Sequence, residues 1–319
     1  MASLNETQLA ALSETQLAAL STTQLRAITT TGIAALTATQ VATLSPTQIA
    51  NLTTTQMGAL TATEVQSLGN AQLAALTTTQ IAALSTTAVA GLTTTELAAL
   101  TTRQLGALNA TQFGALSATQ LAALTTAQIG VLTTTEISGL TETQVALLTD
   151  TQLAALSATQ LAALTETGIQ GLSATQLANL GETQFRQLTP DQIGDLTTTQ
   201  FAALSATRIG QLTTTQIAGL THTEIESLST TQLAALDAAQ LGAFNATQMG
   251  SLTSTAVSAL TTAQLGALAT TQIAALGTTA VTGLTATEIA ALSTRQLTAL
   301  TATQRSEERR VGKECRSRW

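Results

Sequence analysis

Residues 156–164 read Leu-Ser-Ala-Thr-Gln-Leu-Ala-Ala-Leu, which is one eight-residue unit followed by the first residue of the next. The unit recurs in register through 38 copies over residues 4–304, and its first position is Leu in 36 of them. We number the octad positions from 1 (Leu156) to 8 (Ala163). Self-similarity at a fixed short period is typical of repeat architectures, so the fold follows from one octad and its packing on its neighbours.

Each octad carries the signals of a helix N-terminus. The residue at position 2, Ser157 in this copy, can cap a helix by accepting from the amides of the first turn. Gln160 at position 5 can reach back to the amide of the cap, which completes a capping box. Leu156 and Leu161, at positions 1 and 6, flank the cap as a hydrophobic staple. The sequence therefore predicts a short helix that begins directly after each position 2, with Leu156 and Leu161 facing one continuous interior.

The rare residues support this register. The chain has two prolines, Pro46 and Pro190, and both follow the cap directly. This is the first helical position, where the missing amide of proline costs nothing. Position 5 is Gln or Glu in 32 of 38 octads. The five octads with Glu are those of Glu64, Glu96, Glu136, Glu224 and Glu288, and the six exceptions are Gly32, Ala88, Gly168, Arg208, Ala256 and Ala280.

The spacing of the apolar positions excludes simpler folds. In one continuous helix, eight residues would advance the apolar stripe by about 80° beyond two turns, so it would face no partner. In a half-buried strand, the alternating spacings of five and three would place side chains on both faces. We therefore predict an all-α solenoid or superhelix of very short capped helices, one in each octad, with a β-solenoid as the alternative.

Composition limits the class of protein. Hydrophobic residues make up 44% of the chain, whereas charged residues make up 9% and aromatic residues 2%. No apolar run approaches the roughly 18 residues of a membrane span, which predicts no membrane insertion. The octads carry five Arg, no Lys and 15 acidic residues, a net charge of about −10. Because phosphate neutralisation requires Lys and Arg, this charge argues against nucleic acid as a partner.

The last 15 residues, 305–319, differ from the octads in composition. They hold six of the 11 basic residues and the only Cys and Trp of the chain. Their sequence resembles the translation of a sequencing adapter, which implies a non-native, disordered tail. We therefore expect two parts, an octapeptide-repeat solenoid over 1–304, a fragment of a longer array, and this tail.

The octads offer no convergent set of reactive side chains. The single His, His222, takes the first helical position, where a surface substitution is expected. Glu224 and Glu226 are close in sequence, but Glu224 takes the position of the capping-box Gln. No phosphate-binding glycine loop, zinc spacing or calcium nonapeptide is present. We therefore predict no catalytic, cofactor-binding or metal-binding residue, no cofactor and no enzymatic activity.

The octads resemble the Leu-Thr-x-x-Gln-Ile-x-Ala repeats of large bacterial secreted or surface proteins of the adhesin-like type. This resemblance covers residues 1–304 and implies an extracellular or cell-surface location, although the N-terminus lacks the layout of a signal peptide. We expect a structural spacer, a stalk or scaffold. The alternatives are a solenoid surface that binds an unknown protein or glycan and, third, a Thr array that binds ice from a flat β-face.

Overall fold

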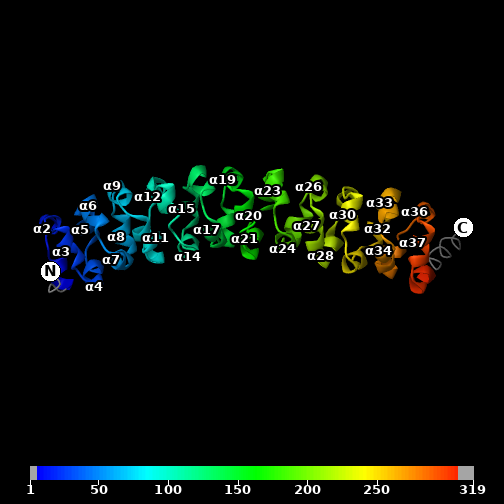
Figure 1. The fold of residues 1–319 in the computed structure, drawn as a ribbon, viewed down its shortest axis with the longest axis horizontal. Helices are drawn as coiled ribbons and strands as arrows, with labels where there is room; N and C mark the ends of the chain where they lie inside the picture. Colours follow the sequence, from blue (N-terminus) through cyan, green and yellow to red (C-terminus); the bar gives the residue numbers. More distant parts are fainter. Residues whose placement is uncertain (1–5, 308–319) are drawn as a thin grey trace. The chain divides into compact units, whose positions relative to one another are not determined.

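The structure is a computed structural model that describes residues 6–307, and these residues form helices and connections without a strand. The chain divides into two compact units, an N-terminal unit of Met1–Gly171 and a C-terminal unit of Leu172–Trp319. Each unit is an all-α solenoid of short helices (Figure 1). The predicted fold class is therefore confirmed, and the β-solenoid alternative is wrong.

The helices of the N-terminal unit are α1 (Glu6–Ala10), α2 (Glu14–Ala18), α3 (Thr22–Arg26), α4 (Thr30–Ala34), α5 (Ala38–Thr43), α6 (Pro46–Ala50), α7 (Thr54–Ala59), α8 (Ala62–Gln66), α9 (Asn70–Ala74), α10 (Thr78–Ala82), α11 (Thr86–Gly91), α12 (Thr94–Ala99), α13 (Thr102–Leu105), α14 (Ala110–Gly114), α15 (Ala118–Ala122), α16 (Thr126–Gly130), α17 (Thr134–Ser138), α18 (Glu142–Ala146), α19 (Asp150–Ala155), α20 (Ala158–Leu161) and α21 (Glu166–Gln170).

The helices of the C-terminal unit are α22 (Ala174–Asn179), α23 (Glu182–Arg186), α24 (Pro190–Gly194), α25 (Thr198–Ala202), α26 (Ala206–Gly210), α27 (Thr214–Gly219), α28 (His222–Ser227), α29 (Thr230–Ala234), α30 (Ala238–Gly242), α31 (Ala246–Gly250), α32 (Ser254–Ser258), α33 (Thr262–Ala267), α34 (Thr270–Ala275), α35 (Thr278–Val281), α36 (Ala286–Ala291) and α37 (Thr294–Ala299).

Every one of these helices begins at octad position 3, as predicted. At α20 the backbone of the cap Ser157 is extended, its hydroxyl accepts from the amide of Gln160 at 3.2 Å, and its own amide donates to Gln160 Oε1 at 2.7 Å. Pro46 and Pro190 open α6 and α24. The Thr side chains of position 2 therefore stand at helix N-termini, not on the flat β-face that ice binding would require.

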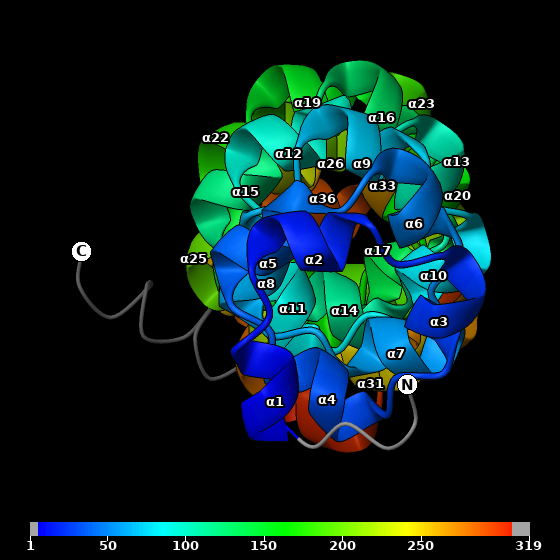
Figure 2. The ribbon, with the colours of Figure 1, turned by 90° about the vertical axis from the view of Figure 1, so that its left-hand side faces the viewer.

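Each helix ends after four to six residues because the chain turns into the next cap. Within the N-terminal unit, each helix packs against the third helix after it, for example α1 on α4, α2 on α5 and α3 on α6. Figure 2 looks along this unit and shows these three pairs at three places around its axis. The C-terminal unit repeats the pattern, with α24 on α27 and α31 on α34. Three octads thus bring the chain back alongside itself.

The interior of each unit is made by octad positions 1 and 6. Leu156 is 3% exposed to solvent and Leu161 is 0% exposed. Phe113 and Phe201, at position 6 of other octads, are also 0% exposed. Burial of such side chains is worth roughly 1.5–3 kcal/mol each, which makes these two positions the main apolar source of stability. The prediction of one continuous interior is confirmed within each unit.

Some octads end on a glycine because two helices approach closely there. A Cβ atom placed on Gly91, at the end of α11, would lie 2.6 Å from the backbone of Ala62 at the start of α8. No such atom fits, so the absence of a side chain lets α8 and α11 pack directly.

Helical structure continues after the last octad helix named above. Residues 302–307 are helical, and the amide of Arg305 donates to the Thr301 carbonyl at 3.0 Å. The first three residues of the tail thus extend a helix, where disorder was expected. The rest of the tail predicted over 305–319, residues 308–319, lies outside the described residues.

Candidate functional site

The most regular polar feature of both units is a hydrogen-bonded bridge made by the Gln at position 5. Its Oε1 accepts from the cap three residues earlier, as predicted. Its Nε2 donates to carbonyls 28 to 31 residues earlier, at the C-terminal end of the helix four octads back. Gln104 Nε2, for example, lies 2.8 Å from the Leu73 carbonyl oxygen and 2.9 Å from that of Leu76. We call this arrangement the carboxamide bridge.

The carboxamide bridge recurs with the same offsets in both units. In the N-terminal unit, Gln56 donates to Leu25 and Ile28, each at 2.8 Å. In the C-terminal unit, Gln272 donates to Leu241 at 2.8 Å and to Phe244 at 2.9 Å. One side chain thereby joins the amide of its own cap residue to two backbone carbonyls at the end of an earlier helix. The first of these carbonyls, Leu25 for Gln56, also accepts from the Ile28 amide at 3.1 Å.

The bridging Gln side chains are buried, although Gln is a polar residue. Gln104 is 5% exposed and Gln56 is 2% exposed, whereas Gln16 and Gln24 in the first octads are exposed. No octad lies four repeats before Gln16 or Gln24 in this chain. Burial of the Gln therefore depends on the preceding turn of the solenoid, and buried amides of this kind require their hydrogen bonds.

Sequence reasoning found the capping half of the bridge and missed the half that joins turns. One signal could have revealed it. A carboxylate at position 5 would cap equally well and would complement the helix dipole, yet Gln is far commoner there than Glu. The preference for an amide indicates that the NH₂ group has a partner.

Arg208 keeps the donating half of the bridge. Its guanidinium donates to the carbonyls of Ala178, at 2.6 Å, and of Leu180, which are the positions that a Gln amide would reach. The same guanidinium lies 5.1 Å from the centre of the Phe185 ring, a cation–π contact. An octad with an unexpected residue at position 5 thus still joins its turn to an earlier one.

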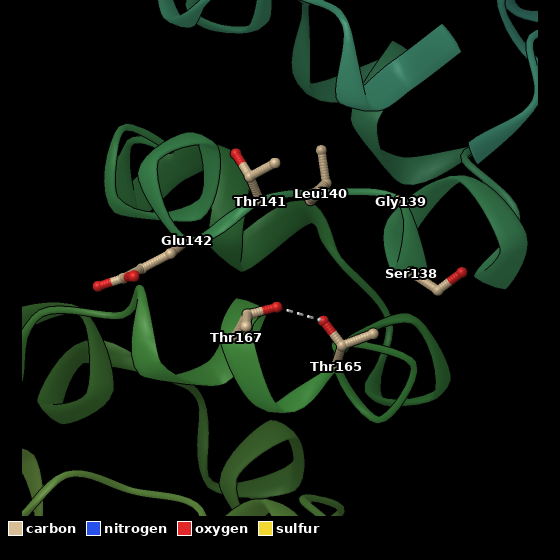
Figure 3. A pocket seen from close by; sticks show the side chains of 7 residues that line it. All are labelled: Ser138, Gly139, Leu140, Thr141, Glu142, Thr165 and Thr167. Carbon is tan, nitrogen blue, oxygen red and sulfur yellow. Dashed lines mark hydrogen bonds between the residues drawn. The ribbon is translucent and has the colours of Figure 1, made fainter. Parts of the chain in front are cut away.

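Gly168 and Ala88 are position-5 residues without an amide, and a surface hollow lies in the groove near each of them. The hollow at Gly168 has a volume of about 510 Å³ and is lined by Ser138, Gly139, Leu140, Thr141, Glu142, Thr165 and Thr167 (Figure 3). The hollow at Ala88, of about 490 Å³, has the equivalent lining, with Ser85 and Thr87 facing Gly58 to Thr63. A further hollow beside Gln40 shows that the groove between turns is not confined to these octads.

The hollow at Gly168 has a mainly apolar lining, with the hydroxyl groups of two threonines on one side. Thr165 and Thr167, at the start of α21, face the segment from Ser138 to Glu142, and their hydroxyl oxygens are 3.1 Å apart (Figure 3). Such a surface can exchange hydrogen bonds with a polar ligand or with water. Among the residues that line it, only Glu142 is charged, and it is exposed to solvent.

The Glu side chains at position 5 keep only the capping half of the bridge. The amide of Thr61 donates to Glu64 Oε2 at 2.6 Å, and the other carboxyl oxygen, Oε1, is buried without a partner. Oε1 of Glu136 and Oε1 of Glu224 are also buried without a hydrogen-bond partner. Burial raises the pKa of all three carboxyls, against a smaller lowering by hydrogen bonds from their caps.

His222 lies on the surface, as predicted. Its side chain is 61% exposed, with Nε2 3.2 Å from a carboxylate oxygen of Glu226 and Nδ1 2.5 Å from the hydroxyl of Ser251. The structure does not bring Glu224 and Glu226 together as a pair, because Glu224 is buried at its cap and Glu226 is exposed. Within residues 6–307, no group of three His, Cys, Asp or Glu side chains could hold a metal ion.

The helices of the described chain are all too short to cross a lipid bilayer.

A comparison with curated proteins finds no match. The family model described as the ALTTAQ repeat matches residues 9–46, 22–54, 49–86, 65–102 and 98–134. These stretches overlap and lie within the N-terminal unit, where the octads carry the carboxamide bridge. The chain therefore contains a repeat region of the ALTTAQ type.

Proposed function

We propose that the chain is a structural spacer, a stalk or scaffold segment of a bacterial secreted or cell-surface protein of the adhesin-like type. The observation that carries this proposal is the equivalence of the octads. The carboxamide bridge joins position 5 to the same carbonyls, 28 to 31 residues earlier, in both units. The proposal assigns no catalytic role to the chain.

Because of the carboxamide bridge, the length of the solenoid can change by whole octads without altering its hydrogen bonds. A helix of about five residues is too short to be stable in water on its own, so each octad depends on the turns before and after it. Adding or removing a whole octad preserves every offset, because the remaining Gln side chains still meet a carbonyl 28 residues earlier. Repeat proteins built in this way have stabilities that sum over neighbouring repeats.

The test is a series of in-register deletions of one, two, three and four octads from residues 98–134 and, separately, from 230–267. Surface display and attachment of the carrier cell are measured for each variant. A spacer predicts a graded dependence on the number of octads and no dependence on which octads are removed. Deletion of four residues serves as the control, because it moves position 5 away from its carbonyls and should unfold the neighbouring turns.

A second candidate function is the binding of a protein or glycan in the groove between turns. The observation that favours it is the hydroxyl lining of the hollow at Gly168 (Figure 3). Here Thr167→Val, with Thr159→Val in a bridged octad as control, should reduce attachment selectively. Equal attachment by both variants would leave the spacer as the better account.

A further inference from the structure

Three octads bury a carboxyl group with one oxygen unsatisfied. Glu64, Glu136 and Glu224 are 2%, 1% and 2% exposed. In each, Oε2 accepts from the cap, at 2.6 Å from the Thr61 amide and 2.7 Å from the Thr221 amide, for example. Oε1 has no hydrogen-bond partner in any of the three. A buried acceptor without a donor is costly, so these oxygens require an explanation.

The octad register shows what each free oxygen faces. In bridged octads this place holds the Nε2 of Gln, which donates to carbonyls 28 to 31 residues earlier. The equivalent carbonyls for Glu136 belong to Leu105, Gly106 and Leu108, at the end of α13. A Cβ atom placed on Gly106 would lie 3.8 Å from Oε1 of Glu136, which locates the oxygen at that helix end. The unpaired carboxyl oxygen therefore faces backbone carbonyl oxygens, and both groups are hydrogen-bond acceptors.

We propose that Glu64, Glu136 and Glu224 are proton-binding sites, in which the neutral carboxyl donates its O–H to the carbonyls of the helix four octads earlier. The proton comes from solvent, and no bond other than the carboxyl O–H forms or breaks. The neutral carboxyl then makes the same hydrogen bonds as the Gln amide. Its Oε2 accepts from the amide of the cap, and its Oε1 donates to a carbonyl of the earlier turn.

The dimensions of the bridge fit a proton better than a metal ion. In the octad after Glu136, Gln144 Nε2 lies 2.7 Å from the Leu116 carbonyl oxygen and 3.1 Å from that of Phe113. An O–H···O hydrogen bond spans about 2.5–3.0 Å. A calcium ion would need six to eight oxygens, each about 2.3–2.6 Å away, which one carboxyl oxygen and these carbonyls do not supply.

The surroundings of Glu64 and Glu136 contain few charges. Glu64 lies on α8, which packs on α5 and α11, and its facing carbonyls belong to α4. None of these three helices carries a charged side chain. Glu136 lies on α17, which packs on α14 and α20, and the helix that it faces, α13, carries the exposed Arg103. Burial is the largest cause of the raised pKa at both carboxyls.

Glu224 has more charged neighbours. It lies on α28 with His222 and Glu226, which pair with each other, and packs on α25 and α31, which carry no charge. The helix that it faces, α24, carries Asp191 and ends at Asp195, whose charge adds to the effect of burial in raising the pKa of Glu224.

The raised pKa determines how the stability of the folded chain changes with pH. The folded state binds the proton more tightly than the unfolded chain, so the contribution to stability is fully present below the ordinary pKa of Glu. It is lost as the pH rises through the raised pKa of the folded state. Mild acid should therefore tighten the turns that contain these three octads.

The test is a carbon-13 NMR titration of the Glu carboxyl groups in the full chain. The single variants Glu64→Gln, Glu136→Gln and Glu224→Gln each remove one signal and so assign it. We expect these three carboxyls to titrate above the ordinary pKa of a Glu side chain, which is about 4.3. Titration of all three at the ordinary pKa would overturn the proposal. A displacement of the three titrations by added Na⁺ or Ca²⁺ would also overturn it, in favour of a cation site.

A matched pair of variants tests the hydrogen bond itself. Gln144→Glu should create a fourth carboxyl that titrates at high pH, and its octad should become less protected from amide exchange in mild alkali than in mild acid. Glu136→Gln should make protection of its own octad independent of pH and at least as high as that of wild type in acid. If Glu136→Gln leaves the pH dependence unchanged, or Gln144→Glu adds none, the proposal is wrong.

Discussion

Replacement of Gln104 by Glu tests the carboxamide bridge with a nearly isosteric change. The carboxylate can still accept from the Thr101 amide, as Gln104 Oε1 does at 3.0 Å. It loses the two donated hydrogen bonds to Leu73 and Leu76, at 2.8 and 2.9 Å. Each such bond is worth about 0.5–1.5 kcal/mol, and the oxygen left without a donor costs about 1–3 kcal/mol more. We expect a local loss of about 2–6 kcal/mol at neutral pH.

The matched control is Gln16→Glu in the second octad. Gln16 makes the same capping bonds, with its Oε1 2.8 Å from the Ser13 amide, but it is exposed and has no octad four repeats before it. A carboxylate near a helix N-terminus is favourable by about 0.3–1 kcal/mol, so the control should be neutral or slightly stabilising.

The assay for both variants is amide hydrogen exchange measured by mass spectrometry on peptides around residues 68–76 and 100–108. Local exchange is preferable to a global melting curve, because long repeat arrays do not unfold as two states. Faster exchange in Gln104→Glu at both peptides, with the control unchanged, is the expected result. If Gln104→Glu behaves like the control, the bridge contributes nothing and the reasoning is refuted.

Three further predictions concern the close packing of two helices, an octad that lacks the bridging amide and the apolar interior. Gly91→Ala should destabilise α11 through its clash with Ala62, and Gly266→Ala, where a Cβ meets nothing within 4 Å, should stabilise α33 by roughly 0.5–1 kcal/mol. Amide exchange around α11 and α33 measures both effects. Ala88→Gln should restore the carboxamide bridge of its octad and slow local exchange by an amount equivalent to about 0.5–1.5 kcal/mol, and unchanged exchange would show that no bridge forms. Leu161→Ala should cost about 2–5 kcal/mol in local stability, and a loss below about 1 kcal/mol would place this side chain outside the interior.

The local structure of the octad could be predicted from its sequence. The cap, the capping box and the staple depend on residues within one octad, and Ser157, Gln160 and Leu161 carry all three. The two prolines fixed the register independently, since Pro46 and Pro190 fit only at the start of a helix. The predicted interior followed from the spacing of Leu156 and Leu161.

The connection between turns could not be predicted in the same way. Which carbonyl receives the amide of Gln104 depends on how many octads make one turn, and this number is set by the bend at each cap. A small change in that bend would move the partner by a whole octad. The free oxygen of Glu136 and the hollow at Gly168 depend on the same offset. They could be recognised only after the bridge itself was known.

The most direct test of the bridge is a through-hydrogen-bond scalar coupling, measured by NMR between Gln side-chain nitrogen and backbone carbonyl carbon. We expect couplings from Gln104 Nε2 to the carbonyls of Leu73 and Leu76, and none from Gln16 Nε2 to any backbone carbonyl. Slow exchange of the side-chain amide protons of Gln104 relative to those of Gln16 should accompany the couplings. Equally fast exchange of both side-chain amides, without a coupling from Gln104, would contradict the account.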